Sequence, residues 1–86
     1  MFRIAVVEDD AQYAKTIQNY LDRFEQEHKV AFEQTVFTDG DGILQKYESQ
    51  FDLILMDIEM PLVDGMTAAR EIRAVDEKVM IIFITN

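Results

Sequence analysis

The spacing of apolar residues changes repeatedly along the chain, and each change marks a new predicted element. Four short runs rich in aliphatic, β-branched or aromatic residues predict strands at residues 2–7, 29–38, 51–57 and 80–85. Three segments with apolar residues at helical spacing predict helices. They are about residues 11–27 with a stripe of Tyr13, Ile17, Leu21 and Phe24, a short helix after 39–42, and a third helix with a stripe of Met66, Ala69, Ile72 and Val75. The predicted order is therefore βαβαβαβ.

Local signals indicate where two of these helices begin. Asp10 is the expected N-cap of the first helix, since an Asp side chain accepts hydrogen bonds from the free N–H groups of a first helical turn. The turn sequence "DGDG" at 39–42 precedes the short helix, which is expected to carry Ile43, Leu44 and Tyr47 inward.

The alternation of strands and helices predicts an α/β fold with a doubly wound parallel sheet, covered by helices on both faces. The nearly continuous aliphatic content of the first, third and fourth strands indicates burial on both of their faces. In such sheets, binding sites form beyond the carboxyl ends of the strands, where the strand order reverses. Glu8 and Asp9 follow the first strand and Asp57 ends the third. If these two strands are neighbours, three carboxylates converge at one edge of the sheet.

Three neighbouring carboxylates repel one another, and burying any of them without a partner is costly, so the arrangement calls for a divalent cation. Oxygen ligands of this kind suit Mg²⁺, which binds one or two carboxylates and keeps several waters. A carboxylate beside such an ion can act as the nucleophile in phosphoryl transfer, and Asp57 is the natural candidate. Taken singly, the acidic residues have simpler explanations, as a solvated acidic turn or as caps of turns.

Composition narrows the class of protein. The 86 residues are 49% apolar and 29% charged, which is typical of one globular domain. The absence of cysteine excludes a disulfide framework and Cys-based zinc sites, and no apolar run approaches the length that spans a bilayer. The formal charge of −9 argues against direct binding to nucleic acid or to an anionic membrane. We expect a soluble, cytoplasmic protein whose partners are cations or basic protein surfaces.

Together these motifs resemble the receiver domain of bacterial two-component response regulators, over the whole length of the chain. The acidic pair in "VVEDD", the aspartate in "LMDIEMPLVDG" and the threonine in "FIT" carry the resemblance. It implies a flavodoxin-like fold with strand order 2-1-3-4, and an Asp57 that accepts a phosphoryl group from a sensor histidine kinase. It also implies that Asp9 and Asp57 bind Mg²⁺ directly, with Glu8 acting mainly through water. The backbone carbonyl of Glu59 would be a further ligand, and Thr85 would be the switch hydroxyl.

The same resemblance implies that residues 1–86 form a receiver domain without the family's last helix–strand–helix segment, which carries a lysine at the end of a fifth strand. None of the four lysines matches it, since all lie at or near the predicted helices: Lys15, Lys29, Lys46 and Lys78. Without a fifth strand, the strand at 80–85 becomes an unpaired edge, so we expect a homo-oligomer or a strand-swapped dimer. The wording of "DIEMPLVDGMTAAREIR" and "IIFITN" further resembles regulators whose output is a LytTR-type DNA-binding domain.

Two other functions remain open from the sequence. One is a protein-binding module that uses the fold without phosphorylation, which the missing lysine favours. The other is an Mg²⁺-dependent phosphohydrolase that forms an aspartyl phosphate. Enzymes of the haloacid dehalogenase type place a second Asp two residues after the nucleophile, whereas Glu59 occupies that position here. The sequence therefore favours a phosphoacceptor domain over an enzyme.

Overall fold

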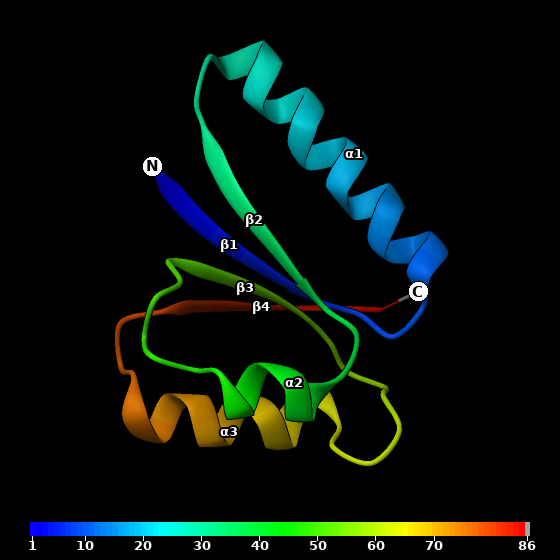
Figure 1. Ribbon diagram of the computed structural model, residues 1–86, viewed down its shortest axis with the longest axis vertical. Helices are drawn as coiled ribbons and strands as arrows, with labels where there is room; N and C mark the ends of the chain where they lie inside the picture. The colour runs from blue at the N-terminus through cyan, green and yellow to red at the C-terminus, as the bar shows by residue number, and fades with distance from the viewer. Residues whose placement is uncertain (86) are drawn as a thin grey trace.

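A four-stranded parallel sheet with helices on both faces forms the protein in the computed structural model, which describes residues 1–85. The elements in chain order are β1 (Phe2–Val7), α1 (Ala11–His28), β2 (Phe32–Phe37), α2 (Gly40–Gln45), β3 (Leu53–Asp57), α3 (Gly65–Val75) and β4 (Met80–Ile84). The strand order is β2-β1-β3-β4, and every pairing is parallel, as predicted. Helix α1 lies on one face of the sheet, while α2 and α3 lie together on the other (Figure 1).

The predicted helix starts are confirmed in detail. The side chain of Asp10 accepts hydrogen bonds from the backbone N–H groups of Gln12 and Tyr13, so it caps α1. The same helix ends at His28, and the next residue, Lys29, caps it in the left-handed conformation with φ of 53°. Asp39 caps α2 in the same way as Asp10, through the N–H of Gly42. Short polar side chains therefore define the helix starts, as their positions in the sequence indicate.

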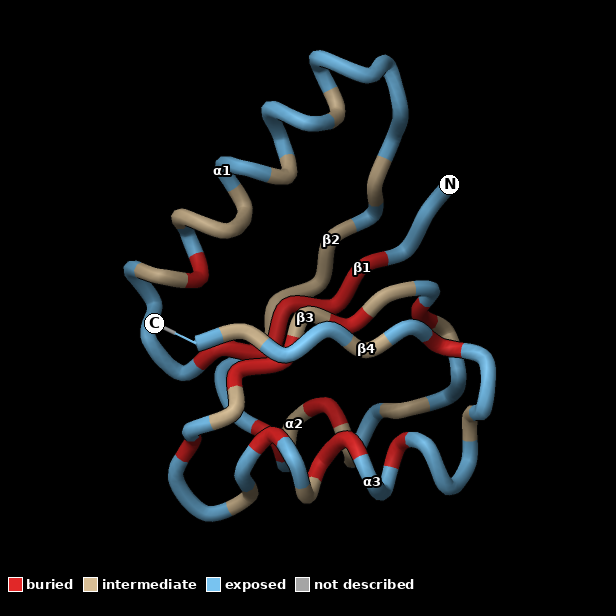
Figure 2. Tube along the Cα trace, turned by 180° about the vertical axis from the view of Figure 1, so that it is seen from behind, coloured by how far each residue is buried: buried red, intermediate tan, exposed pale blue. Residues whose placement is uncertain are grey.

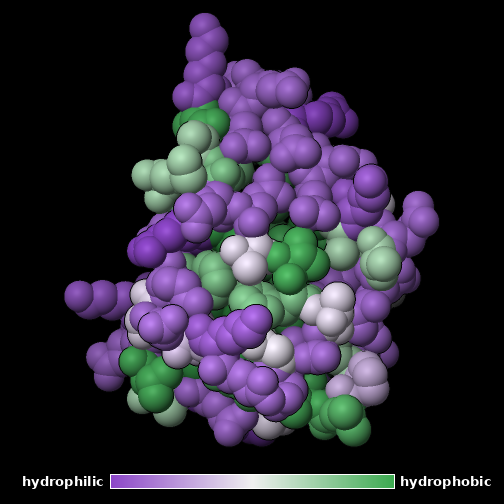
Figure 3. Space-filling model, viewed as in Figure 1, coloured by the Kyte–Doolittle hydropathy of each residue, from purple (hydrophilic) through white to green (hydrophobic). Residues whose placement is uncertain are grey.

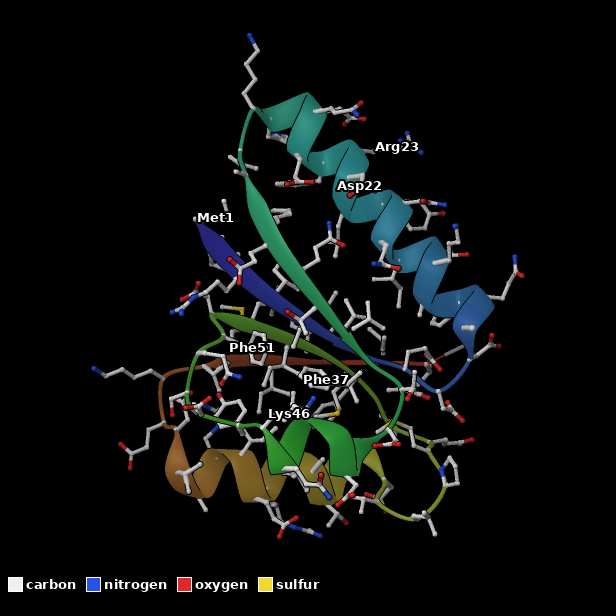
Figure 4. The ribbon with its side chains drawn as sticks, viewed as in Figure 1. Met1, Asp22, Arg23, Phe37, Lys46 and Phe51 are labelled. Atoms are coloured by element: carbon white, nitrogen blue, oxygen red, sulfur yellow. The ribbon has the colours of Figure 1, made fainter. Side chains whose placement is uncertain are left out.

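Most of the buried core lies between the sheet and the pair α2 and α3 (Figure 2). Ile43 from α2, Ile54 from β3 and Ile72 from α3 are at most 1% exposed. Phe37 and Phe51 meet edge to face, with ring centroids 5.9 Å apart, between the sheet and α2 (Figure 4). Hydrophobic residues gather over this region in the space-filling view, whereas α1 presents a mostly polar outer surface (Figure 3).

Helix α1 is packed less deeply than its amphipathic pattern predicts. Ala14 is its only buried residue, and Phe24 on the expected inner stripe remains 47% exposed. Polar contacts contribute to its attachment, since the Glu25 carboxylate accepts from the Phe32 N–H at 2.7 Å and Asp22 accepts from the Gln34 amide at 3.0 Å. The two faces of the sheet are thus covered unequally.

The predicted stripe of α3 is partly wrong, because the helix is rotated relative to it. Its buried residues are Gly65, Ala68, Ala69 and Ile72, whereas Met66 is 48% exposed and Val75 is 71% exposed. The small side chains of Ala68 and Ala69 let this face approach the sheet closely, so the larger residues flank the contact. Tyr47 also lies outside α2, which ends at Gln45, although its ring still packs against the core.

Burial of β4 on both faces is a further prediction that the structure contradicts. Met80 is 60% exposed, Ile82 is 45% exposed and Phe83 is 38% exposed. The physical reason is position: β4 lies at an edge of the sheet, while α1 packs against β1 and β2, and α3 against β3 and α2. The observed strand β2, Phe32–Phe37, is also shorter than its predicted run. Within residues 1–85, no helix is both long and apolar enough to cross a bilayer.

Candidate functional site

Two neighbouring strand ends bring three carboxylates together. Strand β1 pairs with β3 in a register that places Val7 beside Met56, so the residues that follow each strand emerge at the same edge. Glu8, Asp9 and Asp57 each offer a carboxylate oxygen there, and these oxygens lie within 4.8 Å of one another. We call these three residues the acidic cluster. Its assembly is the convergence expected if the first and third strands are neighbours, as they are in the sheet.

Glu8 is the most deeply buried member of the acidic cluster, with 0% exposure. Its Oε2 accepts a hydrogen bond from the Asp10 N–H at 3.0 Å, whereas its Oε1 is buried without a hydrogen-bond partner among the described residues. Burial raises the pKa of the Glu8 carboxyl to about 7, against the lowering effect of the Asp10 N–H, and the negative charge of Asp57 adds to the rise. A buried carboxylate with an unpaired oxygen requires either a proton or a cation.

Asp57 is 3% exposed at the end of β3. Burial is the main cause that raises the pKa of its carboxyl, and the neighbouring Asp9 raises it further. The Glu59 N–H donates to Oδ1 of Asp57 at 3.3 Å and opposes this rise, as does the neighbouring Glu8 carboxyl. Asp9 is exposed, so the cluster has one carboxylate on its solvent side and two beneath it.

The chain after Asp57 folds back tightly against the end of β3. The N–H of Gly65 donates to the carbonyl of Ile58 at 2.9 Å, and the N–H of Ile58 donates to the carbonyl of Ile84 at 3.2 Å. A Cβ built on Gly65 would lie 2.1 Å from the Asp57 carbonyl oxygen, so only glycine fits there. This close backbone approach is visible only in three dimensions.

Glu59 and Thr85, the other two predicted site residues, lie near the same edge. Glu59 is exposed and follows Asp57 by two positions, with its N–H directed to the Asp57 carboxylate. Thr85 directly follows β4, whose last residue, Ile84, is paired with Asp57. The Thr85 carbonyl oxygen accepts a hydrogen bond from the Tyr13 hydroxyl at 3.0 Å. Tyr13 counts only as an inward-facing apolar residue in the sequence pattern, so its polar contact was not predicted.

No lysine or arginine within residues 1–85 forms an ion pair with the acidic cluster. Within the described part of the chain the ion pairs are Arg3 with Asp52 and Arg23 with Glu27, each at 3.9 Å. The four lysines lie on helix α1, directly after α1 and α2, or between α3 and β4: Lys15, Lys29, Lys46 and Lys78. The negative charge of the cluster is therefore not balanced by an ion pair with any side chain of residues 1–85.

The chemistry of the acidic cluster fits a small, hard cation. It supplies carboxylate oxygens only, and oxygen donors are the ligands that Mg²⁺ prefers. The unpaired buried oxygen of Glu8 is the second observation in favour, since nearby positive charge would compensate it without a proton. A nucleophile at Asp57 next to such a site has the components needed for phosphoryl transfer to a carboxylate.

Comparisons with known proteins agree with this arrangement. Residues 4–86 match the sequence profile of the response regulator receiver domain. Transcription factor SKN7 of Candida albicans is 36% identical over 99% of this chain and 14% of its own length. The uncharacterized transcriptional regulatory protein YvcP of Bacillus subtilis is 38% identical over 99% of this chain and 33% of its own length. The chain thus spans a third or less of these relatives.

Solved structures show the same fold. The response regulator protein TrrA of Thermotoga maritima, solved in complex with Mg²⁺ and beryllium fluoride, is 35% identical with a TM-score of 0.75, over 99% of this chain and 70% of that one. TrrA was also solved in complex with the histidine kinase ThkA, and that structure superimposes with a TM-score of 0.69 at 34% identity, over 99% of this chain and 69% of that one. These matches confirm the flavodoxin-like topology.

Proposed function

Because this chain belongs to the response regulator receiver domain family, we propose that it is a phosphoacceptor signalling domain in which Asp57 takes a phosphoryl group from a sensor histidine kinase. One observation carries the proposal: Asp57 ends β3 beside a buried Glu8 with an unpaired oxygen and an exposed Asp9. The complex of the relative TrrA with a histidine kinase supports the class of donor.

The residues that would hold Mg²⁺ are Asp9 and Asp57 directly, with Glu8 acting mainly through water and the backbone carbonyl of Glu59 as a further ligand. When bound, the ion supplies positive charge that offsets the three carboxylates and polarises phosphoryl oxygens. Asp9 is the exposed carboxylate and can exchange its water for a ligand most readily. Glu8 is fully buried, which fits a role in setting charge rather than in contact with a substrate.

Asp57 is oriented for the transfer step by its own loop. The Glu59 N–H at 3.3 Å restrains rotation of the carboxylate. One carboxylate oxygen forms the new bond to phosphorus while the bond to the donor's imidazole nitrogen breaks, and the electron pair of that bond stays with the imidazole. Thr85, which follows the residue paired with Asp57, would donate its hydroxyl to the phosphoryl group and act as the switch.

The output of this signal is a separate question. Relatives such as YvcP are named as transcriptional regulators, which supports control of a DNA-binding output by the phosphorylation state of the domain. We propose that the output is a LytTR-type DNA-binding domain, because residues 57–73 and 81–86 resemble regulators with that output. Residues 1–86 would then change their contacts with the output domain on phosphorylation and would not bind nucleic acid themselves. Their formal charge of −9 fits this, since it disfavours contact with phosphates of nucleic acid.

Intact-mass measurement after exposure to acetyl phosphate and Mg²⁺ tests the proposal. We expect one added phosphoryl group, and none after Asp57→Asn. Labelling should be slow, because none of the four lysines pairs with the acidic cluster to stabilise the transferring group. Asp41→Asn, which changes an exposed carboxylate of α2, is the control and should label like the parent.

Intact-mass labelling and a turnover assay with a generic phosphate ester together separate the two alternative functions. A protein-binding module that works without phosphorylation would take no label at any Mg²⁺ concentration. An Mg²⁺-dependent aspartyl-phosphate hydrolase would release phosphate continuously from a phosphate ester, which the exposed Glu59 two residues after Asp57 does not favour. Absence of label on the parent chain would therefore contradict the phosphoacceptor function.

A further inference from the structure

A single side-chain hydrogen bond connects the first turn of α1 to the residue that follows β4. The Tyr13 hydroxyl donates to the carbonyl oxygen of Thr85 at 3.0 Å, across 72 positions of sequence. The end of β4 and the start of α1 lie side by side in two opposite views (Figures 1 and 2). Tyr13 is half-buried, so its ring packs at this junction while its hydroxyl reaches the backbone.

On the α1 side, this bond is anchored to the acidic cluster. Asp10 accepts from the N–H of Tyr13 itself at 3.2 Å, which holds the tyrosine backbone in the first helical turn. The N–H of Asp10 in turn donates to the buried Glu8 at 3.0 Å. The position of Tyr13 is therefore determined by the same short turn that carries Glu8 and Asp9.

On the β4 side, the bond is anchored to the residue after Asp57. Within the part of the chain that the structure describes, strand β4 pairs with β3 alone, and its last paired residue, Ile84, lies opposite Asp57. The Ile84 carbonyl accepts from the Ile58 N–H at 3.2 Å, and the next carbonyl, that of Thr85, accepts from Tyr13. Hydrogen bonds and short chain segments thus lead from Glu8 to Tyr13 on one side and from Asp57 to Thr85 on the other, and the Tyr13–Thr85 bond connects the two sides.

We propose that Tyr13 is a positioning residue: its hydroxyl fixes the backbone of Thr85 relative to the acidic cluster and so sets where the Thr85 hydroxyl meets a phosphoryl group on Asp57. This inference rests on the proposed function of Asp57 and Thr85. Phenylalanine would fill the same space at position 13 but leave the Thr85 carbonyl without this donor. The hydroxyl of Tyr13 therefore contributes orientation, and the ring contributes packing.

The test uses beryllium fluoride with Mg²⁺ as a phosphoryl mimic, the combination found in the solved TrrA complex. We expect Tyr13→Phe to weaken binding of the mimic about 2- to 10-fold, the size expected for loss of one neutral hydrogen bond. Binding of Mg²⁺ alone and the unfolding midpoint should stay close to those of the parent. Tyr20→Phe is the matched control, because Tyr20 lies on the same helix with 64% exposure, and it should not weaken binding.

A double-mutant cycle with Thr85→Ala separates positioning from a general structural effect. If Tyr13 acts through Thr85, Tyr13→Phe should cost little further affinity once the Thr85 hydroxyl is gone. The backbone carbonyl ¹³C shift of Thr85 provides a second measurement, and it should move in Tyr13→Phe even without any ligand. Additive losses, or an unchanged Thr85 shift, would overturn the inference.

Failure of the inference and failure of the proposed function look different in this experiment. A parent chain that binds the mimic while Tyr13→Phe binds it equally well removes the role of Tyr13 and leaves the phosphoacceptor function standing. A parent chain that binds no mimic with Mg²⁺ contradicts the phosphoacceptor function, and the positioning role falls with it.

Discussion

Gly65 and Asp57 touch through their backbones: a Cβ on the glycine would stand 2.1 Å from the aspartate carbonyl oxygen. The first turn of α3 therefore rests directly on the end of β3. No flexible side chain lies between them to absorb a change, so any larger residue has to displace the Asp57 backbone or the helix.

Gly65→Ala should accordingly destabilise the fold by about 1–3 kcal/mol, the usual cost of overpacking a tight contact. Urea unfolding measures this. Gly42→Ala is the milder comparison: a Cβ there would lie 3.1 Å from the Asp39 oxygen that caps α2, so the cap has to give by only a few tenths of an ångström, and a helical Ala is favoured over Gly. Equal stability of the Gly65→Ala variant and the parent would show that α3 can shift without cost.

Millimolar Mg²⁺ should raise the thermal unfolding midpoint of the parent chain, because a ligand that binds only the folded cluster stabilises the folded state. Asp9→Ala and Asp57→Ala should each lose most of this rise. A monovalent salt at matched ionic strength is the necessary control, since screening alone also reduces repulsion among carboxylates. Retention of the full rise in both variants would place the ion elsewhere.

Stability without divalent ions should fall as pH rises from about 4.5 to about 7. The folded state raises the pKa of Glu8 from 4.5 to about 7, mainly through burial, so folding takes up a proton within that window. The loss is on the order of 1–3 kcal/mol, from the size of the shift and the full burial of Glu8. Urea unfolding at about pH 5 and about pH 8, with a chelator present, measures it.

Glu8→Gln supplies the check on that pH dependence, because the amide keeps the shape of the side chain and cannot titrate. The variant should lose most of the decline between the two pH values. Glu33→Gln, at an exposed position of β2, should keep it. If the decline in stability persists in full in Glu8→Gln, another titrating group causes it. Asp57 would be the first candidate, since its pKa is raised as well.

The apolar edge at β4 should make the 86-residue chain associate. Met80, Ile82 and Phe83 are exposed along a strand that is paired on one side only within residues 1–85, and such edges recruit other strands. Light scattering should show an average molar mass that increases with protein concentration. The increase should be smaller in Ile82→Lys. Leu62→Lys is the control, because Leu62 is fully exposed in a loop away from any strand. A monomer at all concentrations would contradict the homo-oligomer or strand-swapped dimer.

The sequence predicts the sheet and the acidic cluster, but only the parallel sheet follows from local order. Alternating strand and helix patterns predict parallel pairing, which places the carboxyl ends of all strands at one edge of the sheet. That the first and third strands are neighbours, so that Glu8, Asp9 and Asp57 meet there, is implied by the family resemblance and not by local pattern. The rotation of α3 is less predictable, since periodicity does not reveal that Ala68 and Ala69 permit the closest approach. The contact between Tyr13 and Thr85 is beyond local reasoning altogether, because it depends on how α1 and β4 meet in space.

Unequal coverage of the two sheet faces also has a consequence for how long the site persists. Among the residues of helix α1 itself, Ala14 alone is buried. On the opposite face of the sheet, Ile54 and Met56 of β3 are fully buried. Amide exchange in α1 should therefore proceed through partial openings that leave β1 and β3 protected. Each opening would break the hydrogen bonds by which Asp10 caps α1. The turn that holds Glu8 through the Asp10 N–H would then lose its support. The acidic cluster would thus have a lifetime set by its weakest neighbouring helix, far shorter than that of the core beneath it.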